Sequence, residues 1–141
     1  MGDGAMTVGI AQHAIDIAVD YSLNRKMFGK TLADFQNTQF VLAECQAKVD
    51  AAFLMTLEAA SSLDVGNEDF ALCSEVKLYV PELANEVVYK CSQLMGGYGY
   101  TTDYPMERLY RNVRICTIFE GATEVQKHTV AKLMGLRGKK K

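Results

Sequence analysis

The sequence predicts an all-α fold, an up-and-down four-helix bundle with a short additional helical turn. Apolar residues recur at the three- and four-residue spacing of an amphipathic helix in four segments. Glycines and polar capping residues separate these segments, and no stretch alternates apolar and polar residues over the length of a strand. Hydrophobic residues make up 49% of the 141-residue chain, which is enough for one core. Residues 1–141 are therefore expected to form a single helical-bundle domain.

The first two predicted helices are long. One covers residues 5–26, and Gly29 breaks the helical pattern after it. The apolar stripe of this helix is formed by Ile10, Ala14, Ile17 and Tyr21, with a second stripe of Val8, Ala11, Ile15 and Ala18 beside it. Asp34 is expected to cap the second helix, and Gly66 is expected to end it. The stripe of the second helix contains Leu42, Cys45, Val49, Ala52, Thr56, Ala60 and Leu63.

The third predicted helix begins after a cap at Asn67 and ends at the glycines of residues 96–99. Its apolar stripe contains Cys73, Val76, Val80, Ala84, Val87, Cys91 and Leu94. Pro81 lies within this helix, where a proline removes one backbone hydrogen bond. The short additional turn is expected over residues 104–110, because Pro105 favours the first turn of a helix.

Composition and charge exclude several classes of function. The net charge is −2, so we expect no positively charged surface of the kind that nucleic acids require, and Lys139–Lys141 is interpreted as a solvated end. No apolar run reaches the roughly 18–20 residues that cross a bilayer, which predicts a soluble protein without a membrane span. The four cysteines are widely spaced, which predicts free thiols in a reducing compartment and no metal site.

The segment from Ile118 to Gln126 places a carboxylate beside a glycine, where an apolar segment meets a new helix. That helix is expected to run from Thr123 to Leu136, because Thr123 and Gln126 have the spacing of a capping box. Glu120 then lies at the N-terminal mouth of the helix, where it is a candidate general base. An ordinary cap followed by a turn explains the same spacing, so this segment alone leaves both interpretations open.

Four motifs occur together in a fixed order. They are Arg-x-x-Phe-Gly-Lys at 25–30, Gln-x-x-Gly-Gly-x-Gly at 93–99, Tyr-Pro-x-Glu-Arg at 104–108 and Ile-Phe-Glu-Gly at 118–121. In this combination the chain strongly resembles the C-terminal helical domain of the acyl-CoA dehydrogenase family of flavoenzymes. The resemblance extends from about Val8 to Leu136, and its specificity comes from the joint occurrence of motifs that are individually common.

The resemblance implies a reaction and a base. In the family, a glutamate at the position of Glu120 removes the α-proton of a fatty acyl-CoA while a hydride passes to bound FAD. Such a base is expected to have restricted access to water. Phe119 and Gly121 are expected to line the substrate, with glycine allowing close approach of the thioester. Phe119 replaces the tyrosine that is commonest in the family motif.

The resemblance also implies the cofactor contacts. Arg25 matches an arginine that meets the FAD pyrophosphate, a role suited to its planar guanidinium. The other implied FAD contacts are Phe28, Gln36, Gln93, Gly96 and Gly97, which in the family hold the flavin of a neighbouring subunit, and the backbone of Ala122, Thr123 and Glu124. Ala122 replaces a threonine, which removes one possible hydroxyl contact to the flavin.

The family comparison also implies the protein's context. The chain is expected to be the C-terminal portion of a larger enzyme of fatty acid β-oxidation, inactive when isolated, without its N-terminal helical and middle β-domains. Expected partners are an acyl-CoA substrate, further copies in a homotetramer or dimer, and electron-transfer flavoprotein as electron acceptor. Expected locations are the mitochondrial matrix or the bacterial cytoplasm.

The alternative function is a non-catalytic helical assembly or flavin-contact module derived from the same family. Such a module would keep the helical bundle and lose the chemistry. The presence of Glu120, Arg25, Gln36 and Gln93 argues against it, because packing alone does not require these side chains.

Overall fold

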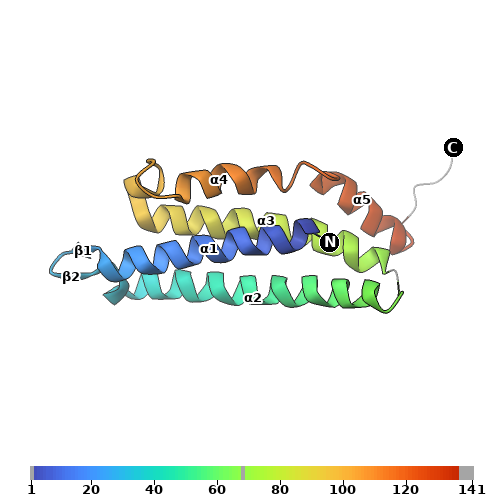
Figure 1. The fold of residues 1–141 in the computed structure, drawn as a ribbon, viewed down its shortest axis with the longest axis horizontal. Helices are drawn as coiled ribbons and strands as arrows, with labels where there is room; N and C mark the ends of the chain where they lie inside the picture. The colour runs from blue at the N-terminus through green and yellow to red at the C-terminus, as the bar shows by residue number, and fades with distance from the viewer. Residues whose placement is uncertain (1, 68, 137–141) are drawn as a thin grey trace.

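The computed structural model describes residues 2–67 and 69–136, and within them it confirms the all-α prediction. The helices are α1 Gly2–Asn24, α2 Gln36–Asp64, α3 Phe70–Met95, α4 Met106–Ile115 and α5 Thr123–Leu133 (Figure 1). The four main helices expected from the sequence correspond to α1, α2, α3 and α5. The short additional turn forms the ten-residue helix α4, which starts directly after Pro105.

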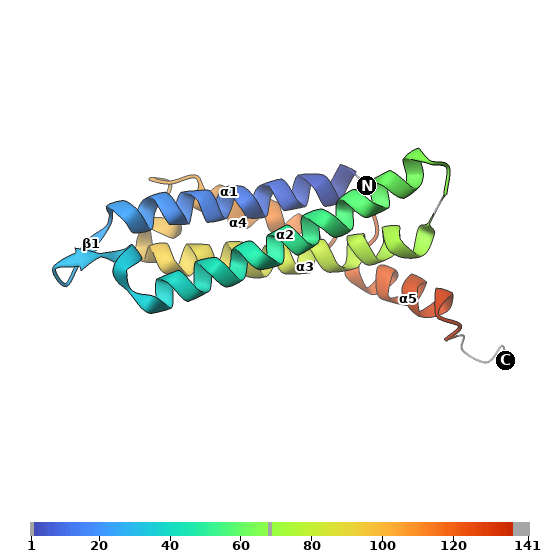
Figure 2. The ribbon, with the colours of Figure 1, turned by 90° about the horizontal axis from the view of Figure 1, so that it is seen from below.

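Helix α3 is central to the arrangement, because it packs against each of the other four helices. Helices α1, α2 and α3 run along the long axis of the molecule, and α2 crosses the other two obliquely (Figure 2). Helices α4 and α5 follow one another along the side of α3 that faces away from α2 (Figure 1). The short connections make neighbouring long helices antiparallel, as in an up-and-down bundle.

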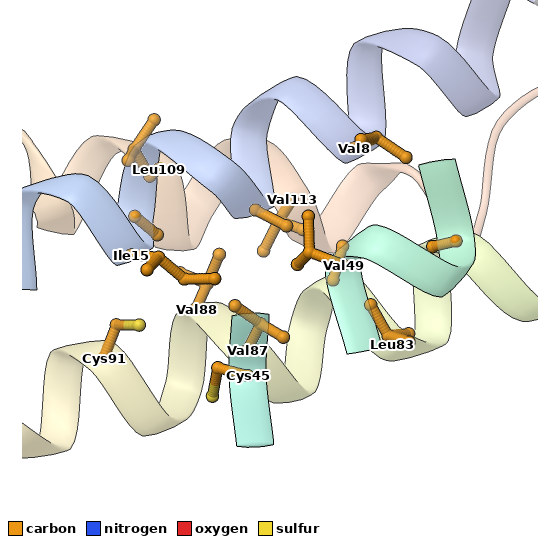
Figure 3. Close-up of a cluster of buried hydrophobic side chains, with 14 of the residues drawn as sticks. Val8, Ile15, Cys45, Val49, Leu83, Val87, Val88, Cys91, Leu109 and Val113 are labelled. Carbon is orange, nitrogen blue, oxygen red and sulfur yellow. The ribbon is translucent and has the colours of Figure 1, made fainter. Parts of the chain in front are cut away.

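The core is built from the apolar stripes that the sequence predicts (Figure 3). Ala11, Ala14 and Ala18 are fully buried on α1, and such small residues allow neighbouring helices to approach closely. The other helices contribute Cys45, Val49, Ala52, Val76, Val80, Leu83, Val87, Val88, Cys91, Leu109 and Val113. Each fully buried aliphatic side chain of this kind contributes roughly 1.5–3 kcal/mol by leaving water. Packing of these stripes is therefore what holds the long helices together.

A small hairpin between α1 and α2 is the main departure from the expected architecture. Strands β1 Lys26–Met27 and β2 Lys30–Thr31 pair antiparallel. The two residues between them have positive φ angles, 50° at Phe28 and 80° at Gly29, and two-residue hairpin turns require such angles. Two-residue strands are too short to produce an alternating pattern, so the sequence contained no strand signal here.

Two of the predicted helix caps are wrong. The Asp34 carboxylate accepts hydrogen bonds from the backbone N and the hydroxyl of Thr31, at 2.8 and 2.7 Å, and α2 begins at the next residue but one. These bonds hold the pKa of Asp34 below its usual value. Helix α3 is capped by Asp69, whose Oδ1 accepts from the backbone N of Leu72 at 3.0 Å, instead of by Asn67. Asp34 therefore accepts from Thr31 and Asp69 accepts from Leu72, and the periodicity of apolar residues indicated neither pair.

Two further helix predictions, the cysteines, the test for membrane spans and the C-terminal lysines complete the comparison with the sequence. Helix α3 continues through Pro81, and α5 ends at Leu133, three residues before the predicted end. All four cysteines are free thiols, and three of them are buried. Across the described ranges no helix is long and apolar enough to cross a membrane. The proposed solvated end Lys139–Lys141 lies outside the described residues.

Candidate functional site

The residues singled out in the sequence fall into two groups that are far apart along the bundle. One group surrounds the β1–β2 hairpin and the end of α3, and we call this region the hairpin end. Its predicted site residues are Arg25, Phe28, Gln36, Gln93, Gly96 and Gly97. The other group lies in the α4–α5 connection, close to the start of α1. Its predicted site residues are Phe119, Glu120, Gly121, Ala122, Thr123 and Glu124.

The length of α1 gives the scale of this separation. Asp3 lines a cavity together with Glu120, whereas Arg25 follows the last turn of the same helix. At a rise of 1.5 Å per residue, the two positions on α1 are about 33 Å apart. The hairpin lies at one end of the long axis, and the α4–α5 connection lies well toward the other (Figure 1). One molecule of this chain therefore presents two distinct surfaces, not one compact site.

At the hairpin end, Arg25 and two of the glycines line one cavity of about 460 Å³. The guanidinium of Arg25 lies 5.8 Å from the ring centroid of Tyr98, a cation–π contact that steadies the side chain while leaving it exposed. Gly96 has a φ of 59°, and a Cβ built on either Gly96 or Gly97 would meet no atom within 4 Å. The backbone of these glycines is therefore open to a ligand.

The other three predicted residues of this group lie at the same end of the bundle but do not line that cavity. Phe28 is 87% exposed at the tip of the hairpin, with its ring centroid 6.5 Å from that of Phe35. Gln36 is exposed at the first position of α2. Gln93 lines a neighbouring groove of about 650 Å³, which also contains Gly96. The structure thus gathers all three chain segments at one end, although it does not place every predicted residue in one cavity.

At the other site, residues 117–122 form a tight connection that we call the Glu120 turn. Glu120 has a φ of 51° and Gly121 a φ of 101°. Backbone hydrogen bonds close the turn, from Phe119 N to Ile115 O at 3.1 Å and from Thr123 N to Thr117 O at 3.1 Å. Within the described chain, Glu120 and Phe28 are the non-glycine residues with positive φ. A strained backbone persists only where surrounding contacts maintain it, and such residues cluster at functional sites.

The surroundings of Glu120 differ from those expected for a base with little access to water. Its side chain is exposed and lies at the edge of a cavity of about 240 Å³, which Asp3, Lys77 and Gln126 also line. The residues that line this cavity with Glu120 come from α1, α3 and α5. Phe119 is half-buried and supplies the expected apolar neighbour.

The predicted capping box of the last helix is wrong. The N-cap of α5 is Ala122, and the Thr123 hydroxyl donates to Glu82 Oε1 on α3 at 2.7 Å. The side-chain amide of Gln126 donates to Gly121 O at 3.3 Å, and its end would have to shift to accommodate a Cβ on Gly121. The charged Glu82 carboxylate is a stronger hydrogen-bond acceptor than a neutral group, so the Thr123 hydroxyl donates to it. A φ of 101° therefore favours glycine at position 121, and the contact of Gly121 with substrate stays a prediction.

Sequence reasoning missed three residues of α3 that hold the chain on either side of the Glu120 turn. Lys77 Nζ donates to Cys116 O at 2.5 Å, and Asn85 Nδ2 donates to Val113 O at 3.1 Å. Glu82 accepts from the first residue of α5, as described above. Their only sequence signal was a set of polar residues next to the apolar stripe of a helix, which usually means a solvated face.

Comparisons with known proteins agree with this architecture. A family model described as the C-terminal domain of acyl-CoA dehydrogenase matches residues 1–135. The caffeyl-CoA reductase-Etf complex subunit CarC of Acetobacterium woodii is 39% identical over 134 residues, which are 95% of this chain and 35% of that protein. The mitochondrial short/branched chain specific acyl-CoA dehydrogenase of Rattus norvegicus is 38% identical over 132 residues, 94% of this chain and 31% of that protein.

A solved structure gives the same result. Butyryl-CoA dehydrogenase from Megasphaera elsdenii superposes with a TM-score of 0.93 at 34% identity, covering 96% of this chain and 35% of that one. The chain therefore belongs to the acyl-CoA dehydrogenase family, and it corresponds to the family's C-terminal domain. It spans about a third of the length of the curated relatives that it matches.

Proposed function

We propose that this chain is the C-terminal domain of a larger, FAD-dependent acyl-CoA dehydrogenase and that Glu120 is the base that removes the α-proton of an acyl-CoA thioester. The observation that carries the proposal is the backbone of Glu120. A charged residue with a φ of 51° is held in a turn closed by hydrogen bonds, at the glutamate of the family motif Ile-Phe-Glu-Gly. A base needs such fixed placement, because proton transfer depends on geometry first.

Within this mechanism the chain contributes the base and its setting. The Glu120 carboxylate takes the proton, and the half-buried ring of Phe119 beside it provides apolar surface against the substrate. FAD, when bound, accepts the hydride. Because Glu120 is exposed in this chain, we assign the exclusion of water to the N-terminal helical and middle β-domains of the larger enzyme.

The hairpin end fits one part of FAD. It combines an exposed guanidinium, open glycine backbone and an exposed aromatic ring, which suit a diphosphate joined to flat ring systems. Arg25, Gly96 and Gly97 would hold the pyrophosphate region, with Phe28, Gln36 and Gln93 around it. The backbone of Ala122–Glu124 would contact a flavin near Glu120. Since about 33 Å of α1 separates the two groups, we assign the hairpin end to the FAD of a neighbouring subunit.

This assignment requires a homo-oligomer, a tetramer or a dimer. Helix α2 supports it, because its outer face exposes Phe40, Phe53, Leu54 and Leu57. Large exposed apolar residues along one helix are typical of a surface that another chain covers.

Partners, substrate and location follow the relatives. A relative named as a subunit of a complex with Etf supports electron-transfer flavoprotein as the electron acceptor. The relatives named here act on short, branched, butyryl or caffeyl thioesters, so we propose an acyl-CoA substrate without choosing its chain. We place the enzyme in fatty acid β-oxidation, in the bacterial cytoplasm or the mitochondrial matrix, because relatives come from bacteria and mitochondria.

The test is Glu120→Gln in the complete enzyme, with flavin bleaching on mixing with acyl-CoA as the measurement. The amide keeps the shape of the side chain and loses the base, so the bleaching rate should fall about 10²–10⁴-fold while FAD stays bound. Asp64→Asn, at the exposed end of α2, is the control and should bleach normally. Undiminished bleaching in Glu120→Gln would remove Glu120 from the mechanism. A non-catalytic module would bleach in neither variant nor in the parent.

A further inference from the structure

Lys77 is a nearly buried cation that connects three elements next to the Glu120 turn. Its side chain is only 12% exposed, and its Nζ lies 3.0 Å from Asp3 Oδ2 on α1, where the Asp3 side chain is 5% exposed. The same Nζ donates to Cys116 O at 2.5 Å and lies 5.3 Å from the ring centroid of Phe119. Lysine is rarely buried to this degree, because removing its charge from water is costly unless partners compensate.

The contacts of Lys77 fall where the Glu120 turn begins. Cys116 is the C-cap of α4, and the last carbonyls of a helix have no partner within the helix. A lysine that donates to such a carbonyl fixes the exit direction of the chain and interacts favourably with the helix dipole. Phe119, which the same ammonium group approaches, directly precedes Glu120. Lys77 thus contacts both the carbonyl that directly precedes the turn and the apolar residue within it.

The far end of the turn is held from the same helix. Glu82 accepts a hydrogen bond from the Thr123 hydroxyl at 2.7 Å, so α3 anchors the segment on both sides of Glu120. Asp3 on α1 pairs with Lys77 through Oδ2, and neither carboxylate oxygen of Asp3 has a hydrogen-bond partner within the described residues. The Asp3 carboxylate is therefore compensated chiefly by Lys77, and the pair is formed or lost as a unit.

We propose that Lys77, oriented by Asp3, is a positioning residue that maintains the strained backbone of Glu120. A φ of 51° at a glutamate is unfavourable by itself and persists only when its surroundings determine it. Lys77 and Glu82 provide that constraint from one rigid helix, and Asp3 links it to the start of α1. The proposal rests on the proposed role of Glu120 as base, but its structural part can be measured without substrate or FAD.

Amide hydrogen exchange of the 141-residue chain tests the structural part. The variant Asp3→Asn/Lys77→Met removes both charges together, since removing Lys77 alone would leave a buried unpaired carboxylate. We expect exchange in residues 117–123 to accelerate about tenfold or more as the bonds at Phe119 N and Thr123 N open, while residues 26–36 stay unchanged. The single variant Lys77→Arg keeps the charge and the donors, so residues 117–123 should stay as protected from exchange as in the parent chain. Lys48→Met, in an exposed ion-pair network on α2, is the matched control.

Kinetics of the complete enzyme provide the second measurement. The double variant should lose about tenfold or more in kcat, with KM for the acyl-CoA and FAD content little changed, because the base is present but misplaced. Normal exchange and normal kcat in a folded double variant would overturn the proposal. If that variant does not fold, Asp3→Asn alone decides by the same two measurements. Altered exchange with activity that does not depend on Glu120 would instead contradict the proposed function and leave the structural role intact.

Discussion

The hairpin end and the Glu120 turn differ in how much of their structure the chain itself provides. Around Arg25, the glycine backbone is open and the side chains are exposed, so little within the chain fixes their positions. Around Glu120, side chains of α3 hold the connection on both sides and backbone hydrogen bonds close it. The first region is suited to bind a ligand that supplies the missing contacts. The second is preformed, as a base requires.

The two regions share one feature, which makes their difference informative. Each contains a non-glycine residue with positive φ, Phe28 at the hairpin and Glu120 at the turn. At the hairpin, the positive φ is part of a two-residue turn between paired strands, and the geometry of such a turn requires it. At the Glu120 turn, no paired strands maintain it, and contacts from α3 take over that role.

The largest effect that we predict within this comparison concerns two neighbouring glycines of the hairpin end. A Cβ on Gly99 would lie 2.5 Å from Ser92 O, which is backbone and cannot move aside easily. Gly99→Ala should therefore destabilise the fold by about 1–3 kcal/mol in chemical denaturation. Gly97→Ala meets only open space, so it should leave stability unchanged within about 0.5 kcal/mol and weaken FAD retention instead. Equal stability losses in both variants would show that the open backbone at Gly97 serves structure.

A smaller effect is expected at the Glu120 turn. Gly121→Ala places a Cβ at a φ of 101° against the Gln126 side chain, and should cost about 1–2 kcal/mol of stability. Adding Gln126→Ala should recover only part of this loss, because the backbone strain remains. Urea unfolding of the single and double variants measures both contributions. Complete recovery in the double variant would mean that crowding alone requires glycine at this position.

The smallest effect concerns an ion-pair network that belongs to neither region. Hydrogen bonds from Lys48 and Lys90 lower the pKa of Glu44 and Glu86, and the two carboxylates raise the pKa of both lysines. A lowered carboxyl pKa stabilises the fold above its unfolded value of about 4.3, and this stability is lost as pH falls through the folded pKa. Lys48→Met should lower the thermal midpoint slightly at pH 7, and by progressively less as the pH falls below about 4. High salt should also reduce the difference, because the pairs are exposed.

The long helices could be predicted from the sequence because their information is local and repeated. The stripes through Val49 and Val80 recur at every turn, and the glycines at 66 and 96–99 mark the ends. Individual caps were harder, because Asp34 accepts from Thr31, which precedes it in the chain, and Thr123 donates to Glu82, so neither pairs with the first amides of the helix that it was expected to cap. For Thr123 that partner, Glu82, lies on another helix, and no local pattern indicates such a pair.

The candidate site was predictable to a similar extent. The motifs identified which residues to examine, including Arg25 and Glu120. They could not show that these residues lie far apart in one molecule, since this depends on the direction and length of α1. They also could not identify Lys77, because its partners Asp3 and Cys116 come together only in the folded bundle. Long-range ion pairs leave no periodic signal.

The division of roles between the two regions is tested most directly by the FAD content of two variants of the complete enzyme after gel filtration. Arg25→Ala removes a charged contact worth about 1.5–3 kcal/mol, so FAD binding should weaken about tenfold or more while the thermal midpoint of the FAD-free protein changes little. Glu120→Gln should keep stoichiometric FAD and lose flavin bleaching. Full FAD content with a large drop in midpoint for Arg25→Ala, or loss of FAD from Glu120→Gln, would contradict the account.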